Sequence, residues 1–241
     1  MTSSELPSFE SIRDSNHVVL SSMDMLRLQW KPFGPFSTCI QVVDDVDTSS
    51  GQQPYRINTQ SFHPISTLAV TEPPVSSITV RQDDLEQWEA DWAELHVPHA
   101  DDHPDGTAWA AEMQEDNEEG HWEHTGGDDG EGRKLMRCCN EDRPNATPPL
   151  VVRASTQPFV TIHDFVTTVH PWLQTVRDDI LSAKGVTQGG PLPVETPLYV
   201  HPLGLDRLRL VEGRNQLPDF MHTWQGVAEH GRRRVDVTLV G

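Results

Sequence analysis

The pattern of apolar and polar positions divides the chain into segments of different character. An N-terminal segment, residues 1–22, precedes residues 23–81, in which short apolar runs such as "STCIQVV" and "SSITV" alternate with polar turn signals. Residues 148–241 open on a run of the same kind, "PPLVVRAS", and also contain "LYVHP". Such runs predict short strands, so we interpret 23–81 and 148–241 as two parts of one body.

One long stretch, "TIHDFVTTVHPWLQTVRDDILSAKG", has the period of a helix. Thr161 with Asp164 predicts a cap at its start, and Gly185 is placed to end it. Pro171 predicts a kink, or the start of a second helix. The apolar stripe of this helix consists of Phe165, Val169, Trp172, Val176 and Ile180. Strands with one main kinked helix predict an α+β fold with a small, mostly antiparallel sheet.

Several shorter segments carry less regular patterns. "YRINTQ" is interpreted as a strand, "GTAWAAEMQ" as a second short helix and "LGLDRLRLVEG" as a turn of helix. The chain ends on "RRRVDVTLVG", in which Val235, Val237 and Leu239 lie on one face of a predicted strand.

Residues 82–132 interrupt the body, and they begin with an amphipathic pattern. In "DDLEQWEADWAELH" four apolar side chains follow one another at intervals of three, four and three, which places them on one face of a helix. They are Leu85, Trp88, Trp92 and Leu95. Pro98 marks the expected end of this helix. Three interpretations are open: the face packs on the protein's own body, it docks into a groove of another protein, or the helix forms only transiently.

The acidic charge of the protein is concentrated in the same insert. Residues 82–132 contain 18 of the 37 Asp and Glu and no Lys or Arg, which leaves 19 acids against 18 bases elsewhere. A block of like charge resists compact folding, so we expect most of the insert to be disordered or loosely attached. The formal net charge of -19 argues against nucleic acid or an anionic membrane as a partner.

The insert also gathers histidines, the candidate metal ligands of this sequence. Five of the twelve lie there: His96, His99, His103, His121 and His124. Cys138 and Cys139 follow after a glycine-rich stretch, but no spacing matches a zinc finger or a zinc hydrolase. Pro98 and Pro104 argue against one helical face for the first three histidines. Because a glycine-rich acidic loop gives ligands no rigid support, we expect weak adventitious binding rather than a specific metal site.

The cysteines and the N-terminus bear on where the protein works. Cys39, Cys138 and Cys139 make no disulfide framework, and adjacent cysteines rarely bridge each other because the geometry is strained. The first residues have neither a basic start nor an apolar run, and no stretch approaches the ~20 apolar residues of a membrane span. These features predict a soluble intracellular protein, cytoplasmic or nuclear, in a reducing compartment.

Three stretches resemble a family of uncharacterised fungal α+β domains. "LRLQWKPFGPFST" contains Trp30 near a proline, "FHPISTLAVTEPPVSSITV" contains a turn at Pro73, and "PFVTIHDFV" leads into the start of a helix. The resemblance covers residues 26–80 and 149–241. It implies a small domain of unknown function in a fungus, with the acidic insert elaborating a loop between two strands, and it supplies no catalytic residues.

The sequence contains no phosphate loop, dinucleotide fingerprint, nucleophile elbow or "HEXXH" motif. We therefore predict a non-enzymatic interaction or scaffold protein that uses no cofactor, and in which the stripe of Leu85, Trp88, Trp92 and Leu95 contacts a protein partner. The sequence indicates neither the partner nor an oligomeric state. Two alternatives are an enzyme without a recognisable motif and a metal- or pH-responsive protein that acts through the insert histidines.

Overall fold

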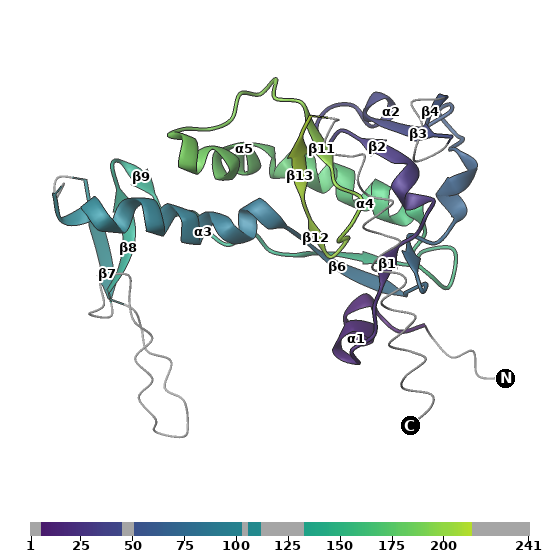
Figure 1. The fold of residues 1–241 in the computed structure, drawn as a ribbon, viewed down its shortest axis with the longest axis horizontal. Coiled ribbons are helices and arrows are strands. Elements are labelled where there is room, and N and C mark those ends of the chain that lie inside the picture. The colour runs from purple at the N-terminus through teal and green to yellow at the C-terminus, as the bar shows by residue number, and fades with distance from the viewer. Residues whose placement is uncertain (1–5, 45–50, 103–105, 112–132, 214–241) are drawn as a thin grey trace. The chain divides into compact units, whose positions relative to one another are not determined.

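The α+β class predicted from the sequence is confirmed by a computed structural model of the chain (Figure 1). The structure describes residues 6–44, 51–102, 106–111 and 133–213. Within these residues it contains five α-helices and thirteen strands, and the strands pair in several small, mostly antiparallel sheets. Among the described residues, no helix is both long enough and apolar enough to cross a membrane.

The chain separates into two compact units, each formed from more than one segment. The first consists of Met1–Asp83, Pro148–Asp179 and Pro193–Gly241. The second consists of Asp84–Thr147 and Ile180–Leu192. The second unit therefore takes in residues on the C-terminal side of the acidic insert, as well as part of the long helical region that follows the insert.

The first unit combines three helices with small sheets. Its elements in chain order are α1 (Phe9–Asp14), β1 (Leu20–Ser21), β2 (Leu28–Trp30), α2 (Phe36–Cys39), β3 (Ile40–Val43), β4 (Gln52–Pro54), β5 (Thr71–Glu72), β6 (Ser77–Gln82), β10 (Leu150–Arg153), α4 (Ile162–Thr175), β11 (Leu198–Val200), β12 (Arg207–Leu208) and β13 (Leu210–Glu212). Strand β6 pairs antiparallel with β10 and parallel with β12. Strands β2, β3 and β4 form an antiparallel sheet, and β1–β5 and β11–β13 are antiparallel pairs.

The main helix α4 begins with the predicted cap. The Thr161 hydroxyl accepts from the Asp164 backbone N–H at 3.0 Å, and the Asp164 carboxylate accepts from the Thr161 N–H at 2.9 Å. The helix continues through Pro171 and ends at Thr175, and α5 (Arg177–Gly185) follows and ends at the predicted glycine. Of the predicted stripe, Phe165, Val169, Val176 and Ile180 are buried, and Trp172 is half-buried.

A hydrogen-bonded histidine lies in the core of the first unit. Trp30, which is 1% exposed, donates its indole N–H to Nδ1 of His170 at 3.0 Å. That leaves Nε2 as the protonated nitrogen, and Nε2 donates to the Gly34 carbonyl at 3.0 Å. A neutral imidazole satisfies both partners, so His170 is a core residue whose two ring nitrogens are both hydrogen-bonded.

This histidine predicts that acid destabilises the first unit. Burial lowers the pKa of His170, and the Gly34 hydrogen bond opposes that shift only in part. The unfolded chain, with a histidine pKa of about 6.5, therefore takes up protons first as the pH falls. The contribution of His170 to the free energy of unfolding is therefore fully present above the unfolded-state pKa, and it is lost as the pH falls below that pKa. We expect the free energy of unfolding to fall as the pH drops below about 7, and His170→Gln to make that fall shallower. Denaturant titrations at several pH values measure this.

The matched control for this prediction is the exposed His17, which belongs to the same unit. His17→Ala also removes one histidine but leaves the Trp30–His170–Gly34 hydrogen bonds in place, so it isolates the effect of the core ring. A His170→Gln variant with an unchanged slope would contradict the assignment of the pH dependence to this core histidine. His63 and His201 have pKa values lowered chiefly by burial, so we expect them to keep part of the slope in every variant.

Three of the shorter sequence predictions are wrong. "LGLDRLRLVEG" forms β12 and β13, because Leu208 and Leu210 are buried in alternation with exposed arginines, which is the period of a strand. "YRINTQ" is a turn, in which the Asn58 side chain accepts from the N–H groups of Gln60 and Ser61 at 2.9 Å each. "GTAWAAEMQ" contributes β7 (Ala108–Ala111) rather than a helix. The predicted closing strand at 235–239 lies outside the described residues.

The second unit consists of one long helix, a small sheet and the second part of α5. Its elements are α3 (Asp83–His96), the 3₁₀ helix η3 (Val97–Asp102), β7, β8 (Arg133–Cys138), β9 (Glu141–Asp142), α5 from Ile180 onward and the 3₁₀ helix η4 (Val186–Gln188). Strands β7, β8 and β9 form an antiparallel sheet. Helix α3 ends at His96, close to Pro98 as predicted. Much of the insert, including His103, His121 and His124, lies outside the described residues.

Candidate metal centre

In the second unit, α3 packs against β8 through a small hydrophobic core. The buried side chains are Trp92, Ala100, Leu135 and Cys138, and Ala93, Val97, Trp109 and Val186 pack against them. Polar contacts reinforce this packing. Glu89 of α3 accepts from Nε of Arg143 at 2.8 Å and lies 2.7 Å from Nζ of Lys134. Arg143 also donates to the Leu135 carbonyl at 2.9 Å, so helix and strand are held together at their polar edge as well.

Two histidines lie where α3 passes into the following 3₁₀ helix. His96 is the last residue of α3, and His99 lies three residues later in η3. Pro98 is the second residue of η3, a position at which proline costs no helical hydrogen bond because the first turn has none. The chain therefore stays helical through the proline. The imidazole centroids of the two histidines are 5.4 Å apart.

Two cysteines lie at the turn that joins β8 to β9. Cys138 pairs with Glu141 across this hairpin, which leaves Cys139 and Asn140 as its two loop residues. Their φ angles are +53° and +64°, the conformation of a type I′ turn. Asparagine adopts this conformation readily, but cysteine does so at a cost on the order of 1 kcal/mol. Cys139 therefore occupies a turn position that glycine or asparagine adopts more readily.

These four side chains converge on one point. One donor atom from each of His96, His99, Cys138 and Cys139 lies within 4.8 Å of all the others. The two Sγ atoms are 3.8 Å apart, and Nε2 of His99 is 3.6 Å from Sγ of Cys138 and 3.1 Å from Sγ of Cys139. Tetrahedral zinc with its usual bond lengths separates two sulfurs by about 3.8 Å and a sulfur from a nitrogen by about 3.6 Å. The cluster is therefore close to the size of a tetrahedral zinc site.

His96 is buried and has few polar contacts. The residue is 5% exposed, and Nδ1 has no hydrogen-bond partner among the described residues, while Nε2 has only the Glu141 carboxylate, 3.6 Å away. Such buried, unsatisfied polar atoms are rare, and each costs about 1–3 kcal/mol. Burial lowers the pKa of His96, the carboxylate of Glu141 at 3.6 Å opposes this, and His99 adds to it. The result favours the neutral imidazole, which is the form that binds metal.

The environment of the thiols also suits a metal. Cys138 is fully buried, with the Thr107 hydroxyl and the His96 carbonyl each 4.0 Å from its sulfur, whereas Cys139 is exposed. Desolvation and the hydrogen bond with Cys138 raise the pKa of the Cys139 thiol. A metal must therefore displace a proton from Cys139 on binding. Two thiolates with two imidazoles form the donor set of structural zinc sites.

The sequence arguments against a metal site do not hold for these residues. Pro98 was expected to separate the histidines, but it lies in the first turn of η3 and keeps the chain helical. The glycine-rich loop was expected to leave the ligands unsupported, but a helix end and a hairpin turn carry them. The usable signals were the three-residue spacing of His96 and His99 and the adjacent cysteines. Nothing in the sequence showed that residues about 40 positions apart meet.

The predicted partner-binding stripe divides between core and surface. Leu85 and Trp92 are buried, Trp88 is half-buried, and Leu95 is 46% exposed. The helix on which the stripe was predicted is confirmed. Trp92 belongs to the core of its own unit, so the part of the stripe that remains accessible to a partner is Trp88 with Leu95.

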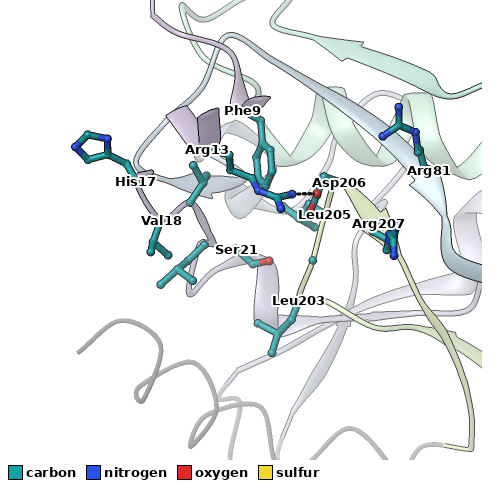
Figure 2. A pocket seen from close by; sticks show the side chains of 13 residues that line it. Phe9, Arg13, His17, Val18, Ser21, Arg81, Leu203, Leu205, Asp206 and Arg207 are labelled. Carbon is teal, nitrogen blue, oxygen red and sulfur yellow. Dashed lines mark hydrogen bonds and ion pairs between the residues drawn. The ribbon is translucent and has the colours of Figure 1, made fainter. Parts of the chain in front are cut away.

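A cavity of about 860 Å³ in the first unit is the other candidate site (Figure 2). Its charged lining includes Arg13, Arg81 and Arg207. Arg13 pairs with Asp206, and Arg207 lies 3.8 Å from the Asp83 carboxylate. In Figure 2 the three guanidinium groups lie apart and do not point toward one centre. Two of these cations already face carboxylates, so the cavity lacks the convergent polar groups that recognise a ligand.

The histidines of the first unit that could have served an enzyme are accounted for by packing. The His163 ring lies 4.4 Å from that of Phe62, with Nδ1 3.5 Å from the Tyr55 hydroxyl. His201 accepts from the Leu203 N–H at 3.3 Å. Neither these two nor the core histidine His170 lines the cavity described above. Among the described residues, the cluster in the second unit is therefore the arrangement with the most specific chemistry.

Comparison of the chain with protein-family models, with curated proteins and with solved structures finds no match. None of these comparisons supports the resemblance to fungal α+β domains, which stays a prediction.

Proposed function

We propose that the second unit binds one Zn²⁺ ion through His96, His99, Cys138 and Cys139. The observation that carries the proposal is the convergence of four donors within 4.8 Å of one another, among them the buried His96, whose ring nitrogens have no partner among the described residues other than the Glu141 carboxylate, 3.6 Å from Nε2. Two thiolates exclude hard ions such as Mg²⁺ and Ca²⁺, which prefer oxygen ligands. Of the common divalent metals, Zn²⁺ matches this donor set and its tetrahedral size.

The role of the ion is structural rather than catalytic. Four protein ligands complete a tetrahedral shell and leave no open position for water or a substrate. The ligands come from the end of α3, from η3 and from the β8–β9 turn, so the ion joins the helix to the hairpin. This supports a non-enzymatic protein in which zinc orders a small module.

The interaction function predicted from the stripe stays a prediction, and it now rests on Trp88 and Leu95. Both lie on α3, the helix that the ion would help to hold. A protein partner that contacts this helix would then bind the zinc-loaded chain better than the zinc-free chain.

Zinc binding is tested on the reduced, demetallated full chain with a matched set of variants. We expect one Zn²⁺ per chain, and Co²⁺ in its place should give the thiolate-to-metal absorption of a tetrahedral site. His99→Ala and Cys139→Ser should weaken binding by more than about 100-fold, since even outer-shell changes cost 10–100-fold. The controls His17→Ala and Cys39→Ser remove one residue of each type from the first unit. Equal affinity in all four variants would mean adventitious binding and would refute the site.

A further inference from the structure

The two thiols of the cluster differ in exposure although they are neighbours in the chain. Cys138 ends β8 and is fully buried, whereas Cys139 is exposed in the turn. Side chains of consecutive strand residues point to opposite faces. Here the positive φ of Cys139 brings its sulfur back, to 3.8 Å from that of Cys138. The site therefore has one thiol that reagents in solution reach and a second thiol within contact distance behind it.

We propose that this zinc site is redox-sensitive, and that a hydroperoxide converts Cys138 and Cys139 to a disulfide and so releases the ion. The proposal rests on the proposed function, because it concerns the same four ligands. With zinc bound, Cys139 would be held as a thiolate despite its raised pKa, and an exposed thiolate beside a second cysteine is the arrangement that favours reversible oxidation. Cys39 lies in the first unit, buried, with its thiol donating to the Phe33 carbonyl at 3.1 Å, and it takes no part.

The chemistry is a two-electron oxidation that consumes both sulfur ligands. The Cys139 thiolate attacks one oxygen of the hydroperoxide, the O–O bond breaks, and the peroxide leaves as an alkoxide, or as hydroxide when it is hydrogen peroxide. The product is a sulfenic acid on Cys139. The Cys138 thiolate then attacks this sulfur, forms the S–S bond and expels hydroxide, which the solvent protonates. The hydroperoxide is the oxidant and is reduced, and the two thiolates are oxidised and together supply two electrons.

Oxidation of both thiolates removes two of the four zinc ligands and so lowers the affinity of the site for zinc. A disulfide sulfur carries no charge and binds zinc poorly, so only His96 and His99 remain as ligands. Closing the sulfurs from 3.8 Å to a bonding distance of about 2.05 Å also pulls both away from their tetrahedral positions. Oxidation and zinc release are therefore one coupled event, and one ion should leave for each disulfide formed.

The same geometry makes the oxidation reversible. A disulfide between adjacent residues closes a small, strained ring, and strain makes a disulfide easier to reduce. A dithiol reductant should therefore regenerate both ligands, and zinc should bind again. The strain that makes a permanent structural disulfide improbable at this position suits one that forms and breaks.

The experiment treats the zinc-loaded full chain with hydrogen peroxide and follows two quantities together. A chromogenic chelator measures released zinc, and mass spectrometry of the tryptic peptide 138–153 reports the thiols. That peptide contains Cys138 and Cys139 but not Cys39, and Pro144 protects its internal Arg143 from trypsin. We expect the peptide to lose two hydrogen atoms in step with the release of one zinc, and both changes to reverse with dithiol and added zinc. Cys39→Ser should behave identically.

The outcomes separate this inference from the proposed function. A reduced chain that binds no zinc at the outset overturns both. A chain that binds zinc and keeps it at peroxide concentrations that oxidise an unbound thiol overturns the redox inference alone. The redox inference is also overturned if zinc is released but the peptide does not lose two hydrogens. Such a result would show oxygen added to Cys139, or a disulfide between two chains, in place of the proposed disulfide. Cys139→Ser, changed at an exposed position, should show no such loss of hydrogen under any dose.

Discussion

Replacing Trp92 with alanine is expected to destabilise the second unit by about 3–5 kcal/mol, the usual cost of removing a buried aromatic side chain. Trp92 is 2% exposed. It belongs to the small core of this unit, together with Ala100 of η3 and with Leu135 and Cys138 of β8. Its ring also lies 4.6 Å from that of His96 and within 6.0 Å of the Arg143 guanidinium. A cavity here would loosen the support of the metal ligands as well as the core.

The matched control for this substitution is Trp88→Ala, one helical turn earlier on α3. Trp88 is half-buried, so its replacement should cost much less, on the order of 1 kcal/mol. Hydrogen exchange of the amides of α3 and β8 measures both effects, with the amides of β6 and β10 as a reference in the first unit. Equal losses of protection in the two variants would show that the packing around Trp92 is not what holds the unit together.

Excess zinc is expected to stabilise the second unit by about 4 kcal/mol when the free ion is 1,000-fold above its dissociation constant. The reason is linkage: the four ligands are close together only in the folded chain, so the ion binds the folded state in preference. The gain should shrink as the pH falls, because protons compete with a metal ion for imidazole and thiolate ligands. Hydrogen exchange of β8 amides, with and without zinc at fixed pH, gives the free-energy difference directly.

Two ligand variants test the expected stabilisation by zinc. His99→Ala should remove most of the gain while leaving the zinc-free protection of β8 nearly unchanged, since His99 is only partly buried. The same gain in Cys139→Ser as in the original chain would contradict the expectation, because a three-ligand site cannot bind as tightly as a complete one.

Elements whose structure depends on residues close together in the chain were predicted correctly from the sequence. The capping box of Thr161 and Asp164, the end of α5 at Gly185 and the helix from Asp83 to His96 all follow from residues within a few positions of one another. The misread segments show the limit of this approach. In "LGLDRLRLVEG" the leucines fit a helical turn and a strand alike, and pairing with β6 and β11 decides for the strand.

The sequence by itself determined the α+β class, the main helices, the N-terminal cap of α4 and the concentration of acidic charge in one insert, because composition and short-range patterns carry that information. Only the tertiary structure decided that His96 and His99 meet Cys138 and Cys139, and that Trp92 is core while Leu95 is exposed. The physical reason is that these outcomes depend on how α3 packs against β8, a contact between segments about 40 residues apart that no local pattern encodes.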